Sequence, residues 1–173
     1  VTWGDDATLQ LAAVQGRLQA SAGSHPLWVA LAHFLSRLPV PEPAYGVNLA
    51  SALGAAATIA VLFAILRRLH VSITASLVAT AAFAVSHTFW AHAVRAEVYS
   101  LTLASMALPV LLALTWYDGG GDVLLELLGA SIGLALSTHV LVLLYLPALA
   151  WLLWRQRGRM RLRQAATLLA GVL

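Results

Sequence analysis

Two adjacent carboxylates, Asp5 and Asp6, stand near the start of the chain and precede the segment Ala7-Thr8-Leu9-Gln10. A pair of carboxylates could act as a general base or bind a cation. Aspartate is also a common residue at the start of a helix, because its side chain accepts a hydrogen bond from the first backbone N–H groups. Spacing alone does not separate these two interpretations, so both stay open.

A second group of ionisable residues surrounds Glu97, with His92, Arg95 and Tyr99 nearby. Arg95 and Tyr99 are four positions apart and would share a helix face, whereas Glu97 would point elsewhere. A guanidinium group binds phosphate oxygens through paired hydrogen bonds, so Arg95 could clamp a phosphate. The alternative is an interfacial salt bridge in which the arginine stem lies along apolar surface.

Two histidines stand out by position. His139 is the strongly polar residue near the middle of a long apolar run, where an imidazole could hydrogen-bond a lipid headgroup or a substrate hydroxyl, or simply satisfy a backbone carbonyl. His25 precedes Pro26, and proline in the first turn of a helix is common, so His25 alone is interpreted as a loop residue. Asn48, one turn into an apolar run, could cap or bridge helices. Three further histidines match no pattern and are interpreted as structural: His33, His70 and His87.

Several classes of site find no support in the sequence. Metal-ligand spacing, glycine-rich phosphate loops and catalytic-triad spacing are missing, so a metal site is not indicated, although a divalent ion is left open. Cysteine is absent, which excludes disulfides and thiolate chemistry. All ten basic residues are arginine and the net charge is only +3, so no basic face for nucleic acid is predicted.

The composition places these residues in a membrane. Apolar residues make up 61% of the chain and charged residues 10%, and the mean hydropathy is +0.84. A soluble domain of 173 residues has no interior large enough to bury that much apolar surface, so lipid is the expected partner. Because the chain lacks an initial methionine and ends in a short apolar run, we expect a fragment of a larger protein.

The apolar runs predict an all-α, multi-pass transmembrane helix bundle. A membrane-spanning helix needs about 20 mostly apolar residues. Pro109 indicates a kink within one span, and residues 118–122 form a polar turn. The run from 123 to 154 is too long for one span, so two short helices are expected to meet at His139. The predicted spans are 45–66, 71–90, 98–117, 123–138 and 140–154, with a truncated one from 165.

Residues 1–44 are too polar to span and are predicted to form an external loop with two amphipathic helices on the membrane surface. Leu11, Val14 and Leu18 repeat at helical spacing in the first. The second is expected over 26–38, with one apolar face formed by Leu27, Leu31, Phe34, Leu35 and Leu38. Arginine favours the cytoplasmic side, and more arginines follow the predicted spans at 67–68 and 155–163 than lie on the opposite side. Residues 1–44 and 92–97 are therefore predicted to face away from the cytoplasm.

The order of these features resembles the GT-C superfamily of membrane glycosyltransferases, and within it the bacterial protein O-mannosyltransferase-like family, formerly a domain of unknown function. The most specific segment is FWAHAVRAEVY, residues 89–99. Four other segments carry the resemblance: the acidic motif at 4–8, His25-Pro26-Leu27-Trp28, Val47-Asn48-Leu49, and Leu136-Ser137-Thr138-His139 with Pro147. Thr8 departs from the pattern, since the family has glutamate at that place.

This resemblance implies transfer of a sugar from a polyprenyl-phosphate carrier to a protein or glycan acceptor, on the extracytoplasmic face of the cell (inner) membrane. It implies that Asp5 is the general base, with Asp6 the candidate to replace the carboxylate missing at Thr8. Glu97, Tyr99, His139 and His25 are expected to line the donor site, and phosphate chemistry adds Arg95.

Two other classes remain alternatives. In a membrane solute transporter, Arg95, Glu97 and His139 would line a pathway, but the ionisable groups gather on one side and paired broken helices are missing. A non-catalytic membrane scaffold would fit the missing carboxylate at Thr8.

Overall fold

The structure, a computed structural model, describes residues 6–18, 23–121, 123–155, 166 and 168, and for Asp6 only the backbone. This part of the chain is helical and contains no strand, which confirms the predicted all-α class. The elements are α1 (Asp6–Gln15), α2 (Pro26–Leu35), α3 (Pro43–Arg68), α4 (Ile73–Ala84), α5 (His87–Ala93), α6 (Tyr99–Tyr117), α7 (Val123–Leu136), the 3-10 helix η1 (Val140–Leu144) and α8 (Leu146–Arg155).

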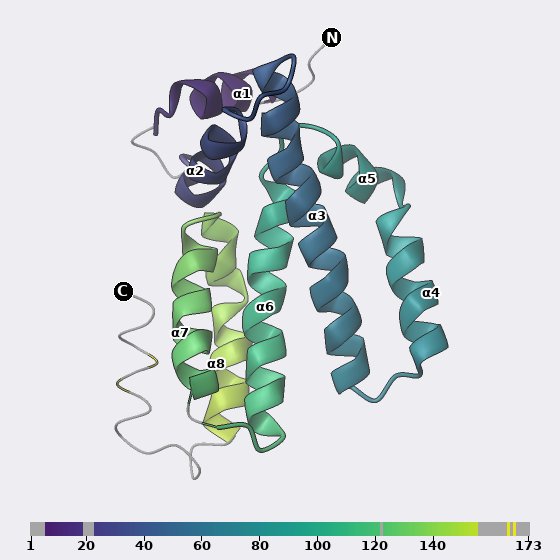
Figure 1. The fold of residues 1–173 in the computed structure, drawn as a ribbon. Coiled ribbons are helices and arrows are strands. Elements are labelled where there is room, and N and C mark those ends of the chain that lie inside the picture. The colour runs from purple at the N-terminus through teal and green to yellow at the C-terminus, as the bar shows by residue number, and fades with distance from the viewer. Residues whose placement is uncertain (1–5, 19–22, 122, 156–165, 167, 169–173) are drawn as a thin grey trace.

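Helices α3 and α6 form the centre of the molecule and run side by side (Figure 1). Helix α3 has 26 residues and α6 has 19, and both are long and apolar enough to cross a membrane. Pro43 begins α3, where its missing N–H costs nothing, and Arg67 and Arg68 end it, where their charge complements the helix dipole. We call the end of the molecule that carries α1 and α2 the upper end, and the end that carries residues 69–72 and 118–121 the lower end (Figure 1).

The segment predicted as one span from 71 to 90 is divided into α4 and α5, which meet at an angle of 68°. Residues Val85 and Ser86 separate them, and the Ser86 hydroxyl donates to the carbonyl of Phe83 at 2.7 Å. A serine that bonds back to the preceding turn competes with the helical pattern, and helices often break there. Counting this bent pair, up to three candidate membrane spans are found among the described residues.

The chain from 123 to 155 rises from the lower end along α7, turns at residues 137–139, and returns through η1 and α8 (Figure 1). Thr138 holds the turn, because its hydroxyl donates to Ala135 at 2.6 Å and shares a 2.9 Å hydrogen bond with Ser105 of α6. Helices α7 and α8 have 14 and 10 residues, fewer than the roughly 20 needed to span alone. Among the described residues, the predicted spans 45–66 and 98–117 correspond to helices long enough to cross a membrane, and 123–138 and 140–154 correspond to shorter ones.

Helices α1 and α2 cover the upper end of α3. The buried face of α2 consists of Trp28, Val29, Ala32 and Leu35, and these residues pack with Ala13, Val47, Ala50 and Val98 in one apolar cluster. Of the apolar face that was predicted to lie on the membrane surface, Leu35 is buried in the protein and Phe34 is 69% exposed. The reason is that α3 packs against the side of α2 that carries the large Trp28 side chain.

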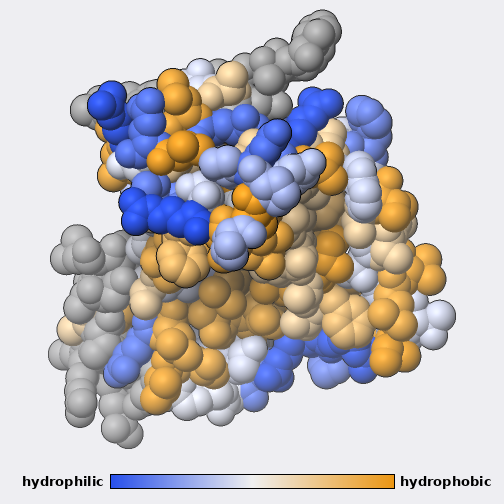
Figure 2. All heavy atoms as spheres, turned by 45° about the horizontal axis from the view of Figure 1, so that its top comes forward, coloured by the Kyte–Doolittle hydropathy of each residue, from blue (hydrophilic) through white to orange (hydrophobic). Residues whose placement is uncertain are grey.

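The surface divides into zones along the length of the bundle. Figure 2 shows apolar side chains across the middle of the molecule, with hydrophilic residues gathered at the upper end and along the lower edge. Leu77 and Val78 of α4 and Leu127 of α7 belong to the exposed apolar residues. Such a large exposed apolar surface needs an apolar environment, which fits helices that lie in a bilayer.

Candidate active site

His25 is fixed between α2 and the turn that follows α7. It precedes α2 in the left-handed backbone conformation, with φ of 46°, and its Nδ1 lies 2.8 Å from the carbonyl oxygen of Thr138. Next to it, the Leu27 N–H donates to the Ser137 carbonyl at 3.2 Å. A carbonyl only accepts hydrogen bonds, so Nδ1 of His25 carries a proton and Nε2 is the acceptor of the neutral ring.

His139 has the opposite tautomer. It caps η1, and its Nδ1 accepts a hydrogen bond from the Leu141 N–H at 3.0 Å. The neutral ring therefore carries its proton on Nε2. Partial burial, and then the nearby charge of His25, lower the pKa of His139 below its ordinary value, which favours this neutral form. The pair thus combines an acceptor nitrogen on His25 with a donor nitrogen on His139.

Four rings from separate segments meet at the upper end. The ring centroids of His25 and His139 are 4.9 Å apart, those of Tyr99 and His139 are 5.8 Å apart, and those of His92 and Tyr99 are 5.1 Å apart. His92 belongs to the last turn of α5, and Tyr99 begins α6. We call these four residues the ring cluster.

Two cavities adjoin the ring cluster, and His25 lines both. One has a volume of about 210 Å³ and is bounded by α1 and the segment before α6, with Thr8, Glu97 and Tyr99 in its wall. The other, about 260 Å³, lies between the start of α2 and the turn after α7, with Ser137 and His139 in its wall. Together they offer imidazole, phenol, carboxylate and hydroxyl groups within one small region.

The backbone of Glu97 is held by a buried serine of α3. Ser51 Oγ donates to the carbonyl of Glu97 at 2.9 Å and lies 3.1 Å from the Glu97 N–H. Ala96 and Val98 on either side are buried, so the whole segment is pressed against α3. This contact places the Glu97 side chain at the first cavity.

The hydrogen bonds between α3 and α6 that support the site were not predicted from the sequence. Ser100 Oγ donates to the Ser51 carbonyl at 2.8 Å, and Thr58 Oγ1 donates to the Ser100 carbonyl at 2.8 Å. The available signal was the spacing of hydroxyl residues at positions 51 and 58, seven apart on one face of an otherwise apolar helix. Hydroxyl groups inside a span are expected to bond a neighbouring helix, although the sequence does not say which one.

Three further residues were predicted to belong to the site: Arg95, Asp5 and Asp6. Arg95 is exposed between α5 and α6 and lines neither of the two cavities. Its expected helical pairing with Tyr99 is wrong, because residues 94–98 are not helical and α6 begins only at Tyr99. Asp5 lies outside the described residues, while Asp6 begins α1, the helix that brings Thr8 and Leu9 to the first cavity.

Two other polar residues considered in the sequence, His33 and Asn48, do not belong to the ring cluster. His33 bonds the Ala13 carbonyl at 2.8 Å and joins α2 to α1. Asn48 Oδ1 is buried without a hydrogen-bond partner in the described part of the chain, so the expected bridge from its oxygen does not form there. Across the same part, no group of three or more histidine, aspartate or glutamate side chains is placed to hold a metal ion.

Comparison with known proteins gives a family. The family model described as the protein O-mannosyl-transferase TMEM260 N-terminal domain matches residues 11–162. The chain belongs to this family. The match supports the O-mannosyltransferase-like resemblance and a glycosyltransferase activity, and it includes His25, Glu97, Tyr99 and His139, whereas Asp5 and Asp6 precede it. No curated protein and no solved structure matches the chain.

Proposed function

We propose that the protein is a GT-C type glycosyltransferase, which transfers a sugar from a polyprenyl-phosphate-linked donor to a hydroxyl group of a protein or glycan acceptor. The family points to sugar transfer. The observation that carries the proposal is the meeting of His25, Tyr99 and His139, together with Glu97, around two cavities at the upper end.

The polar groups suit a donor that presents a sugar and a phosphate together. The Nε2–H of His139 and the phenol of Tyr99 can donate hydrogen bonds to phosphate or sugar oxygens, and Glu97 can accept from sugar hydroxyls. The negative charge of an approaching phosphate also stabilises the protonated form of an imidazole ring. His25 or His139 can therefore take up a proton as negative charge develops on the leaving phosphate. Arg95, exposed at the same end, supplies a further cation for the phosphate.

In the proposed reaction the acceptor oxygen attacks the anomeric carbon of the donor sugar. A new carbon–oxygen bond forms, the bond from that carbon to the phosphate oxygen breaks, and the polyprenyl phosphate leaves with the electron pair. Asp5 takes the proton of the acceptor hydroxyl, and Asp6 supplies the second carboxylate near it. General base catalysis of this kind contributes about 10²- to 10⁴-fold to the rate.

The position of the site fits a lipid-linked donor. Helices α1 and α2 expose Leu11, Val14 and Phe34, which would rest in the headgroup region and leave the polyprenyl chain a lateral path from the bilayer. We place the upper end on the extracytoplasmic face of the cell membrane, because Arg67, Arg68 and Arg155 all belong to the lower end.

The decisive experiment measures sugar transfer by the full-length protein in proteoliposomes. With a polyprenyl-phosphate mannose donor and an acceptor extract, wild type should yield a glycosylated product detectable by mass spectrometry. Asp5→Asn should lower the rate about 10²-fold or more, since it removes the base. His139→Ala should weaken donor binding and raise KM more than it lowers kcat.

His87→Ala is the matched control, because His87 is an exposed histidine of α5 outside the ring cluster. It should leave the rate unchanged. Full activity of Asp5→Asn would show that Asp5 is not the base. Solute uptake without any glycosylated product would indicate a transporter instead of an enzyme.

A further inference from the structure

Helices α3 and α6 are in close contact at the upper end and separate toward the lower end (Figure 1). A Cβ atom on Gly54 would lie only 2.7 Å from the backbone nitrogen of Leu101, and Thr58 bonds the Ser100 carbonyl. Below Thr58, no residue of α3 is buried. The lower third of this helix is therefore only partly covered by its neighbours within the described part of the chain.

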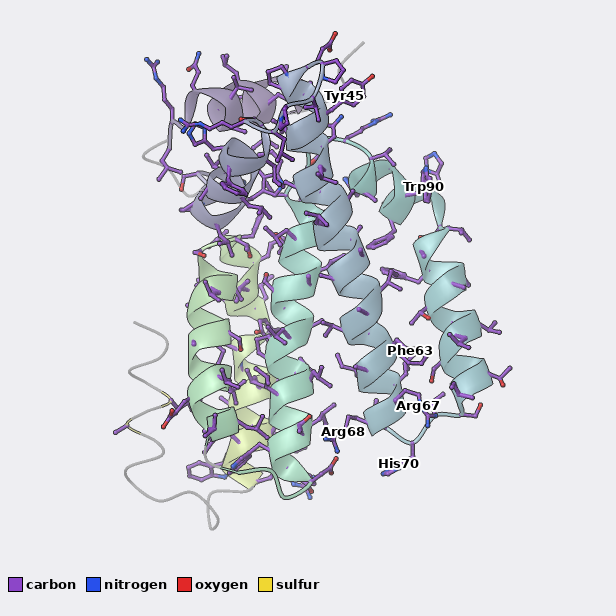
Figure 3. All side chains as sticks on the ribbon, in the orientation of Figure 1. Tyr45, Phe63, Arg67, Arg68, His70 and Trp90 are labelled. Atoms are coloured by element: carbon purple, nitrogen blue, oxygen red, sulfur yellow. The ribbon has the colours of Figure 1, made fainter. Side chains whose placement is uncertain are left out.

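The separation leaves an open cavity of about 620 Å³ between α3, α6 and the start of α7. Its wall is mostly apolar and includes Phe63, Leu111, Leu112 and Leu124. Arg67 and Arg68 line it at the last turn of α3. Figure 3 shows these two arginines and Phe63 at the lower end, with Tyr45 and Trp90 at the opposite end.

Both arginines retain hydrogen-bonding capacity. Arg67 donates to the carbonyl of Val71, and Arg68 forms an ion pair with Asp118 at 3.5 Å, with both side chains more than 40% exposed. Exposed pairs of this kind are weak, and a guanidinium group has five N–H donors. An anion with several oxygens could bind both side chains and displace Asp118 from Arg68.

We propose that this cavity binds one anionic phospholipid, with its phosphate between Arg67 and Arg68 and one acyl chain along Phe63, Leu111 and Leu112. Two cations at the rim of an apolar wall complement a lipid that is charged at one end and apolar along the rest. A soluble phosphate would leave the apolar wall exposed, and a neutral apolar helix would leave the arginines without an anion. The cavity volume lies within the range of about 300–1,000 Å³ that is typical of ligand sites.

This lipid site is separate from the ring cluster, which lies at the other end of α3 and α6. The inference needs a bilayer around these two helices and does not depend on sugar transfer. Only the assignment of the lipid to the cytoplasmic leaflet rests on the proposed function, because it uses the membrane orientation given there. Anionic lipids of that leaflet attract basic residues.

The test compares binding of phosphatidylglycerol and phosphatidylcholine with identical acyl chains to the purified full-length protein, by native mass spectrometry and by the shift in Tm. Wild type should bind phosphatidylglycerol about tenfold more tightly. The double variant R67Q/R68Q should lose this preference. Leu112→Trp should fill the cavity and weaken binding of both lipids while both arginines remain.

Arg155→Gln is the matched control, since Arg155 ends α8 at the same end of the molecule without lining the cavity. It should keep the preference for phosphatidylglycerol. An equal loss in Arg155→Gln would overturn the site in favour of general surface charge. Three other results would contradict a lipid site: competition by millimolar inorganic phosphate, an unchanged preference in R67Q/R68Q, or unchanged binding of both lipids to Leu112→Trp. Circular dichroism checks that each variant is folded.

Discussion

The upper and lower halves of the α3–α6 pair are held together by different interactions. In the upper half, Ser51, Ser100 and Thr58 form hydrogen bonds between the two helices, and Gly54 brings the backbones together. In the lower half the two helices face each other across a cavity of about 620 Å³ with a mostly apolar wall, which includes Phe63, Leu111 and Leu112. Directional bonds fix geometry, whereas apolar side chains at an open cavity can adapt to a ligand.

This difference matches the chemistry expected at each end. A transfer reaction needs groups held within a fraction of an ångström, and the segment with Glu97 and Tyr99 is fixed by Ser51. Lipid binding tolerates looser contacts. The comparison predicts that substitutions in the upper half affect stability and activity more than equivalent substitutions in the lower half.

The largest effect is expected for Gly54→Val. Any Cβ at this position meets the backbone of Leu101 at 2.7 Å, so α3 and α6 must move apart, at a cost of about 3 kcal/mol. Gly121→Val is the control, because a Cβ there meets nothing within 4 Å. Unfolding in mixed detergent micelles measures both. Equal stability of the two variants would contradict the close contact in the upper half.

A smaller loss is expected for Ser51→Ala. The hydroxyl contacts both the N–H and the carbonyl of Glu97, and its removal leaves buried polar groups with fewer partners, at a cost of about 1–3 kcal/mol. Sugar transfer should fall as well, because the Glu97 segment is no longer fixed. Ser76→Ala, which removes a bond from a buried hydroxyl of α4 to the Ser72 carbonyl, should spare the Glu97 segment. Unfolding and transfer rates of the two variants test this.

A pH effect should be confined to the upper end. Burial and the charge of His25 lower the pKa of His139 in the folded protein, so the unfolded chain binds a proton more readily. Stability should therefore fall as the pH drops through about 6.5, the value for an unperturbed histidine. His139→Gln should reduce this dependence, and His87→Gln should not. Melting temperatures between pH 5 and 8 provide the measurement.

The smallest effect is expected for Asp118→Asn at the lower end. Its ion pair with Arg68 is exposed, so the loss of stability should stay below about 1 kcal/mol. Because the variant releases Arg68, it should also bind phosphatidylglycerol slightly more tightly. A stability loss as large as that of Ser51→Ala would mean that the lower end is as firmly held as the upper.

The sequence by itself determined the helical class and the candidate residues. Apolar runs of sufficient length with few charges can only be helices in lipid, and the family match supports the O-mannosyltransferase resemblance drawn from residues 4–147. His25, Glu97, Tyr99 and His139 were singled out from sequence. The resemblance assigned all four to one donor site, but their separation of up to 114 positions gave no indication that the two imidazole rings lie 4.9 Å apart.

The tertiary structure decided how those residues meet and where the helices break. The kink at Val85 and Ser86 and the turn at Thr138 each coincide with a hydroxyl group that bonds back to the preceding turn, and hydropathy averages hide such single groups. The placement of Glu97 depends on Ser51, a contact over 46 positions that only packing of α3 on α6 can create. Local patterns fix the helices, whereas the site forms where several helix ends converge, and that convergence is set by side-chain contacts between distant segments.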